Sequence, residues 1–193
     1  MASVTEKERL RATYYAIRER EEKKPERAEA VRGALLAWLM EQKAKTIGIY
    51  WPVRAEIDIR RIAHQWAKED ADRCVALPVV DDKKKGLMHY APWAETDPLQ
   101  PMAYAIPAPC TPRRVSPDII FAPCVAFNRA GIRLGNGGGF FDRYIAQRKE
   151  SGIPLVTVAV AYEALECKAL QADEFDLPFD FVVTQAGVSK CHS

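Results

Sequence analysis

The chain has 193 residues, of which 48% are hydrophobic, 28% charged and 9% aromatic. This composition predicts a single globular domain over residues 1–193 and excludes a fibrous or disordered protein. The formal net charge of +2 gives no reason to expect nucleic acid or an anionic membrane as a partner.

The first half of the chain alternates between helical and strand patterns. One helix is expected to run to about Glu22, and a second to begin at Pro25, because proline suits a first helical turn. The apolar residues 46–51 stop at Pro52 and predict a buried strand. An amphipathic helix is expected over residues 58–68, with His64 on its surface.

The second half continues the alternation. Residues 92–117 hold seven of the 13 prolines, which favours a long, irregular connection that can be functional. A polar tail is expected after the last strand. The predicted strands cover residues 74–80, 87–90, 118–121, 155–162 and 181–184, and the last helix spans residues 140–149. This order favours a mostly parallel sheet with helices on both faces.

Cysteine usage and the amino-terminal residues predict a cytoplasmic protein. The five cysteines are odd in number and contain no Cys-x-x-Cys pair, so neither a disulfide framework nor a zinc site is expected. The first residues lack the apolar core of a signal peptide. No apolar run approaches the roughly 20 residues of a membrane span.

A glycine-rich segment at residues 131–143 is the strongest functional signal, with five of the ten glycines. Backbone amides in such a loop, followed by a helix amino terminus, can cradle phosphate oxygens. The segment lacks the lysine and hydroxyl of a P-loop, and Phe140 occupies the third glycine position of GxGxxG. A tight turn packed against the sheet is the alternative interpretation.

The full string is more specific than its glycines. Arg-Leu-Gly-Asn-Gly-Gly-Gly-Phe-Phe-Asp-Arg, at residues 133–143, resembles the signature of the 5-formyltetrahydrofolate cyclo-ligase family. Further matches extend in order along almost the whole chain: KERLR at 7–11, WPVRAEID at 51–58, IIFAPCVAF at 119–127 and FDLPFDFVVT at 175–184. The resemblance implies a Rossmann-like, three-layer α/β/α fold, similar to that of sugar-phosphate isomerases and CoA-transferases.

By this resemblance, the chain would close 5-formyltetrahydrofolate to 5,10-methenyltetrahydrofolate at the expense of ATP, through a phosphorylated formyl intermediate. Its partners would be the small molecules 5-formyltetrahydrofolate and ATP, and the protein would be a monomer or a weak homo-oligomer. Lys7, Arg11 and Arg133 would be the catalytic cations on the ATP phosphates. The rest of the ATP site would comprise Leu134, Gly135, Asn136, Gly137, Gly138, Gly139, Phe140 and Phe141.

The resemblance also implies a metal site and a folate site. Mg²⁺ would be held by Asp142, with Asp180 as the second carboxylate; Asp142 could instead cap the following helix, and Asp180 could be a strand-end turn residue. Glu56 would accept the pterin N–H groups. Trp51, Tyr104 and Phe140 would form aromatic walls, although Trp51 could equally be core.

Some features keep alternatives open. Lys7 and Arg11 could belong to a solvated basic stripe with Arg9, Arg18 and Arg20. The family usually has tyrosine at one or both of positions 140 and 141, and some members have lysine at 138 and a polar residue at 108. A non-catalytic folate- or nucleotide-binding regulator and an isomerase-like enzyme for sugar phosphates are therefore the alternative functions.

Overall fold

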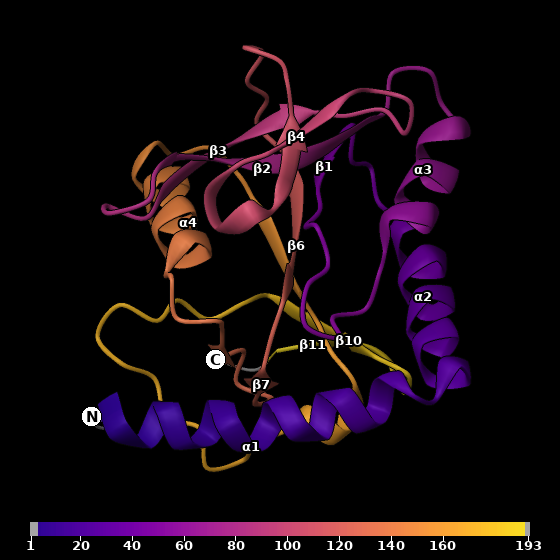
Figure 1. Cartoon of the computed structure of the whole chain (residues 1–193). Coiled ribbons are helices and arrows are strands. Elements are labelled where there is room, and N and C mark those ends of the chain that lie inside the picture. The colour runs from indigo at the N-terminus through magenta and orange to yellow at the C-terminus, as the bar shows by residue number, and fades with distance from the viewer. Residues whose placement is uncertain (1–3, 192–193) are drawn as a thin grey trace.

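A seven-stranded sheet with helices on both faces organises the computed structural model, which describes residues 4–191 (Figure 1). The helices are α1 (Val4–Glu22), α2 (Pro25–Met40), α3 (Arg60–Lys68) and α4 (Phe140–Glu150), with the 3-10 turns η1 (Ala103–Ala105) and η2 (Glu163–Leu165). The strands of the sheet are β1 (Thr46–Gly48), β2 (Cys74–Asp82), β3 (Leu87–Pro92), β6 (Ile119–Pro123), β9 (Val156–Val160), β10 (Phe181–Thr184) and β11 (Gly187–Lys190).

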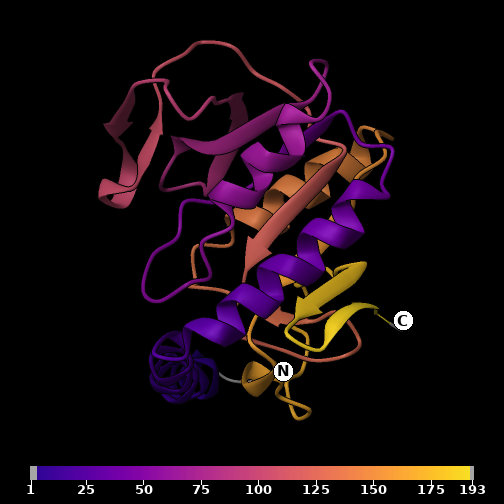
Figure 2. The same cartoon turned by 90° about the vertical axis from the view of Figure 1, so that its right-hand side faces the viewer.

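The strand order is β11-β10-β9-β6-β1-β2-β3. The five inner strands are parallel, whereas β3 and β11 are antiparallel to their neighbours. Helices α2 and α3 cover one face, and α4 covers the other (Figures 1 and 2). The predicted three-layer α/β/α architecture with a mostly parallel sheet is therefore confirmed.

Apolar periodicity accounts for the inner layers. Val31, Leu35 and Leu39 recur every four residues on α2 and are all fully buried against the sheet. Every residue of β6 is buried, as expected of a central parallel strand that has helices on both sides. No helix among residues 4–191 combines the length and the apolar character needed to cross a membrane.

The chain direction creates a natural ligand position next to β1. Strand β1 pairs with β2 on one side and with β6 on the other, so the winding of the sheet reverses there. Ligands of open α/β sheets bind beyond the carboxyl ends of strands at such a point. Helix α1 crosses this end of the sheet and is seen almost end-on in Figure 2.

Four sequence-based expectations need correction. The proline-rich connection contains a small ribbon of β4 (Leu99–Pro101) and β5 (Pro107–Pro109), and the polar tail forms β11. Strands β4 and β5 form a two-stranded sheet of their own, and β11 is an edge strand of the main sheet; proline and polar residues are tolerated in such strands. The strand expected over residues 46–51 ends at Gly48 as β1. The loop that follows it is fixed by a hydrogen bond from the Tyr50 hydroxyl to the Ile57 carbonyl (2.6 Å). His64 is buried against Trp93, not exposed.

Candidate active site

A cleft of about 800 Å³ lies beyond the carboxyl ends of β1 and β6. Its walls come from α1, the loop that follows β1, the β2–β3 pair, η1 and the glycine loop. The predicted residues that line it are Lys7, Arg11, Trp51, Glu56, Tyr104, Arg133, Leu134, Gly135, Asn136, Gly137, Gly138, Gly139, Phe140, Phe141 and Asp142. Segments from most of the chain length therefore meet in one cavity.

The glycine loop connects β8 (Arg133–Leu134) to α4. Strand β8 pairs with β7 (Ala126–Phe127) in a separate two-stranded sheet, so the loop does not follow a strand of the main sheet. Gly137 and Gly139 have φ angles of +98° and +65°, which disfavour residues with a side chain. The loop faces the cleft and Gly137 is exposed, so the loop is not a turn buried against the sheet.

Arg133 is the buried cation of the loop. Its guanidinium lies 5.2 Å from the ring centre of Phe141 and 4.9 Å from that of Phe179. One nitrogen donates to Asp142 Oδ2 (3.0 Å), while Nε has no hydrogen-bond partner among the described residues. Asp142 lies in the first turn of α4 but makes no capping hydrogen bond, so its contact here is the ion pair.

The amino-terminal helix supplies two further cations. Arg11 donates from Nε to the Gly135 carbonyl (3.0 Å), which ties α1 to the glycine loop. Lys7 donates to Asp176 Oδ2 (2.7 Å) and pairs with Asp173. Burial opposes the charge of Lys7, but the two carboxylates outweigh it and raise its pKa. Lys7 and Arg11 are therefore parts of the cleft and not of a solvated stripe.

Glu56 is the most enclosed carboxylate of the cleft, with a side chain only 2% exposed. Its two oxygens accept hydrogen bonds from the Val53 backbone N–H (3.0 Å) and the Asn136 side chain (3.0 Å). Burial raises the pKa of Glu56 and prevails over these contacts. The preceding residues Arg54 and Ala55 have φ angles of 49° and 62°, so a strained turn presents this carboxylate.

Aromatic side chains form the remaining walls. Trp51 is half-buried, with the Arg60 guanidinium 4.0 Å above its ring, so it lines the cleft while packing on the core. Tyr104 is 56% exposed, has a φ angle of 61° and meets Phe140 edge-on at 6.2 Å. The cleft thus combines cations and exposed glycine backbone with aromatic faces and a buried carboxylate, and Asn136 of the glycine loop is hydrogen-bonded to that carboxylate.

Comparison with known proteins decides the family. A model of the 5-formyltetrahydrofolate cyclo-ligase family matches residues 3–185. The chain belongs to this family. A 5-formyltetrahydrofolate cyclo-ligase of Haemophilus influenzae is 29% identical over 187 residues, which cover 93% of this chain and 94% of that protein. The enzyme of Escherichia coli K12 is 28% identical over 150 residues, 75% of this chain and 80% of that one.

Solved structures agree with the family assignment. The 5,10-methenyltetrahydrofolate synthetase of Aquifex aeolicus superposes with a TM-score of 0.78 at 26% identity, covering 97% of this chain and 93% of that chain. A synthetase of Mycoplasma pneumoniae has the same fold, with a TM-score of 0.69 at 22% identity and coverage of 93% and 98%. The resemblance noted from the sequence motifs is thereby confirmed.

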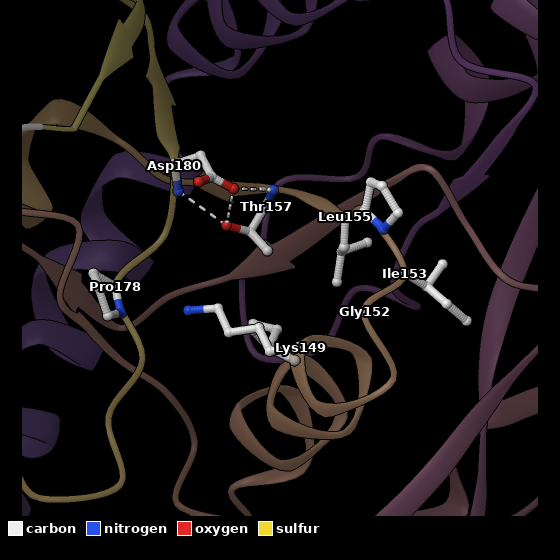
Figure 3. Close-up of a pocket in the computed structure, with 9 residues that line it drawn as sticks. Lys149, Gly152, Ile153, Leu155, Thr157, Pro178 and Asp180 are labelled. Atoms are coloured by element: carbon white, nitrogen blue, oxygen red, sulfur yellow. Dashed lines mark hydrogen bonds between the residues drawn. The ribbon is translucent and has the colours of Figure 1, made fainter.

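Within this cyclo-ligase fold, Asp180 does not reach the cleft. It lies at the start of β10, where Oδ2 accepts hydrogen bonds from the backbone (2.8 Å) and hydroxyl (2.7 Å) of Thr157. Figure 3 shows this contact at a second, smaller cavity of about 220 Å³, which Lys149 and Pro178 also line. Asp180 joins two strands, and the structure does not bring it together with Asp142.

Asp176, from the same segment, lines the cleft instead and is held by Lys7. The segment Phe-Asp-Leu-Pro-Phe-Asp contains both aspartates, and only the first of them, Asp176, lines the cleft. Among the described residues no three acidic, histidine or cysteine side chains cluster tightly enough to form a metal site by themselves. His89 is paired with Asp81 and is not part of the cleft wall.

Proposed function

We propose that this chain is an ATP-dependent 5-formyltetrahydrofolate cyclo-ligase that forms 5,10-methenyltetrahydrofolate, ADP and phosphate. The observation that carries the proposal is the single cleft in which a glycine loop with Lys7, Arg11 and Arg133 meets the buried Glu56. The glycine loop and its three cations suit a triphosphate, and the Glu56 carboxylate suits the adjacent N–H donors of a pterin. The family membership supports pairing these two ligands.

The chemistry needs no protein nucleophile. The formyl oxygen attacks the γ-phosphorus of ATP, the bond to the bridging oxygen breaks, and ADP leaves. N10 of the folate then attacks the activated carbon and gives up its proton to solvent, and phosphate leaves with the former formyl oxygen as the ring closes. Arg133, Lys7 and Arg11 would spread the negative charge of the transferring group.

Magnesium fits the carboxylates that line the cleft. Mg²⁺ is usually held by one or two carboxylates together with substrate phosphates. Asp142 and Asp176 provide such oxygens, and each is already oriented by a cation, Arg133 and Lys7 respectively. When bound, the ion would neutralise charge on the phosphates. Asp142 and Asp176 are thus the proposed ligands, in place of the pair with Asp180.

An absorbance assay tests the proposed function. Purified protein is mixed with Mg·ATP and 5-formyltetrahydrofolate, and methenyltetrahydrofolate is followed by its near-ultraviolet absorbance. We expect a signal that requires ATP, magnesium and folate together. Binding of both ligands without turnover would favour the non-catalytic regulator, which the loss of both loop hydroxyls at Phe140 and Phe141 would suit. Binding of neither ligand would overturn the proposal.

Asp142→Asn should raise the magnesium concentration needed for half-maximal activity by about tenfold or more, because one charged oxygen ligand is lost. Asp176→Asn should act in the same direction. Magnesium titrations of turnover at saturating folate measure both effects. Asp180→Asn is the matched control, since its carboxylate contacts Thr157 outside the cleft, and its magnesium titration should overlay that of the unmodified protein. A shift with Asp180→Asn alone would reverse the assignment.

A further inference from the structure

Arg18 lies beside Glu56 in the wall of the cleft. It follows Lys7 by 11 residues on α1, close to three helical turns, so both side chains lie on the same side of the helix. Lys7 lines the cleft, whereas Arg18 does not and is 2% exposed. The sequence left open a solvated basic stripe that included Arg18, and the structure instead buries this arginine in the wall.

The Arg18 guanidinium faces the Glu56 carboxylate. Its Nη1 lies 3.5 Å from Glu56 Oε1 and donates to the Cys124 carbonyl (3.3 Å). Nε and Nη2 are buried and have no hydrogen-bond partner within residues 4–191. Burying an arginine with unpartnered nitrogens lowers the stability of the fold, and a buried ion pair rarely compensates for the loss of hydration. Stability therefore does not explain Arg18, and we consider its effect on Glu56 instead.

The other groups around Glu56 do not replace this charge. Tyr50 and Cys124 are buried, and burial raises the pKa of Cys124 to about 12 and that of Tyr50 well above its usual range, so both are neutral near pH 7. Asp58 is paired with Arg60, and Asn136 contributes only a neutral amide. Arg54 is a cation but is exposed to solvent, where its charge is screened.

We propose that Arg18 is a positioning residue for substrate recognition, which keeps the buried Glu56 carboxylate charged and oriented for the N–H donors of the pterin. The inference rests on the proposed function, because it takes Glu56 as the pterin-binding group. Burial raises the pKa of Glu56, and the Arg18 charge acts against this rise. Without Arg18 the carboxylate would take up a proton at a higher pH, lose its charge and turn one of its acceptor oxygens into a donor.

The test compares Arg18→Met with Arg18→Lys, which restores a charge. Arg148→Met is the matched control, because Arg148 is also a buried arginine with unpartnered nitrogens but lies outside the cleft. For each variant, kcat/KM for 5-formyltetrahydrofolate and for ATP is measured across the mildly acidic and neutral range. The pKa of Glu56 is followed separately by ¹³C NMR of labelled glutamate, with the signal assigned from Glu56→Gln.

In Arg18→Met we expect kcat/KM for 5-formyltetrahydrofolate to begin to fall about one pH unit higher on the acid side of its pH profile. The Glu56 pKa followed by NMR should move up by the same amount, which is a tenfold change in the protonation equilibrium. The ATP profile should stay within about twofold, and lysine should recover most of the shift. An unmoved Glu56 signal in folded Arg18→Met, or an equal loss for both substrates at every pH, would overturn the inference. Absence of folate turnover in the unmodified protein would overturn the proposed function, while the NMR titration would still decide the Arg18–Glu56 coupling.

Discussion

Arg133→Met should lower kcat by about 100- to 1,000-fold, the usual effect of removing a preorganised donor to transition-state charge. The methionine keeps an apolar stem between the rings of Phe141 and Phe179 but removes the buried cation of the glycine loop. It also leaves Asp142 without its ion-pair partner. Single-turnover kinetics at saturating ATP and folate separate this loss of rate from weaker binding.

Arg148→Met again provides the control for removing a buried guanidinium. Arg148 lies on α4 and donates to the carbonyls of Pro117 and Pro154, away from the cleft. Its removal should lower the melting temperature and leave kcat nearly unchanged. A fall in kcat of similar size in both variants would mean that Arg133 only supports the fold.

Glu56→Gln should raise the KM for 5-formyltetrahydrofolate by about 100-fold, because two charge-assisted hydrogen bonds to the substrate are lost. The KM for ATP should change by no more than about twofold, since the carboxylate itself is not assigned to the triphosphate and the glutamine oxygen can still accept the hydrogen bond from Asn136. Initial rates with each substrate varied at saturating levels of the other measure both constants.

Glu21→Gln is the matched control for this second change. Glu21 is also a buried carboxylate of an ion pair, with Lys24 and Arg27 as partners, but it does not line the cleft. It should cost stability without moving either KM. Equal increases in both KM values for Glu56→Gln would place the pterin elsewhere in the cleft.

The fold was largely predictable because its signals are local. Pro25 marks the start of α2, apolar spacing marks the buried face of that helix, and short apolar runs mark the inner strands. The edge strand β11 was missed because an edge strand carries polar residues and lacks the apolar run that reveals a central one. His64 was misplaced because its burial depends on Trp93, which lies in a distant part of the chain.

Site residues could be predicted from the sequence only where they lie next to one another in a recognisable motif. Residues of the glycine loop and the KERLR segment were found this way, and they do line one cleft. Asp180 was expected at the metal or, alternatively, as a strand-end residue, and the structure places it beside Thr157 just before β10, where no spacing rule could have located it. Arg18 looked like its exposed neighbours on α1, since a sequence does not reveal which turn of a helix lies over a buried carboxylate.

The cleft is built from contacts between distant parts of the chain. Lys7 and Asp176 are 169 residues apart, Arg11 and Gly135 are 124 apart, and Glu56 and Asn136 are 80 apart. Such a high contact order delays assembly, because each of these contacts closes a long loop. The glycine loop and the Arg133–Asp142 pair are local, but the complete cleft needs these distant contacts, so full ligand affinity should appear late in a refolding experiment.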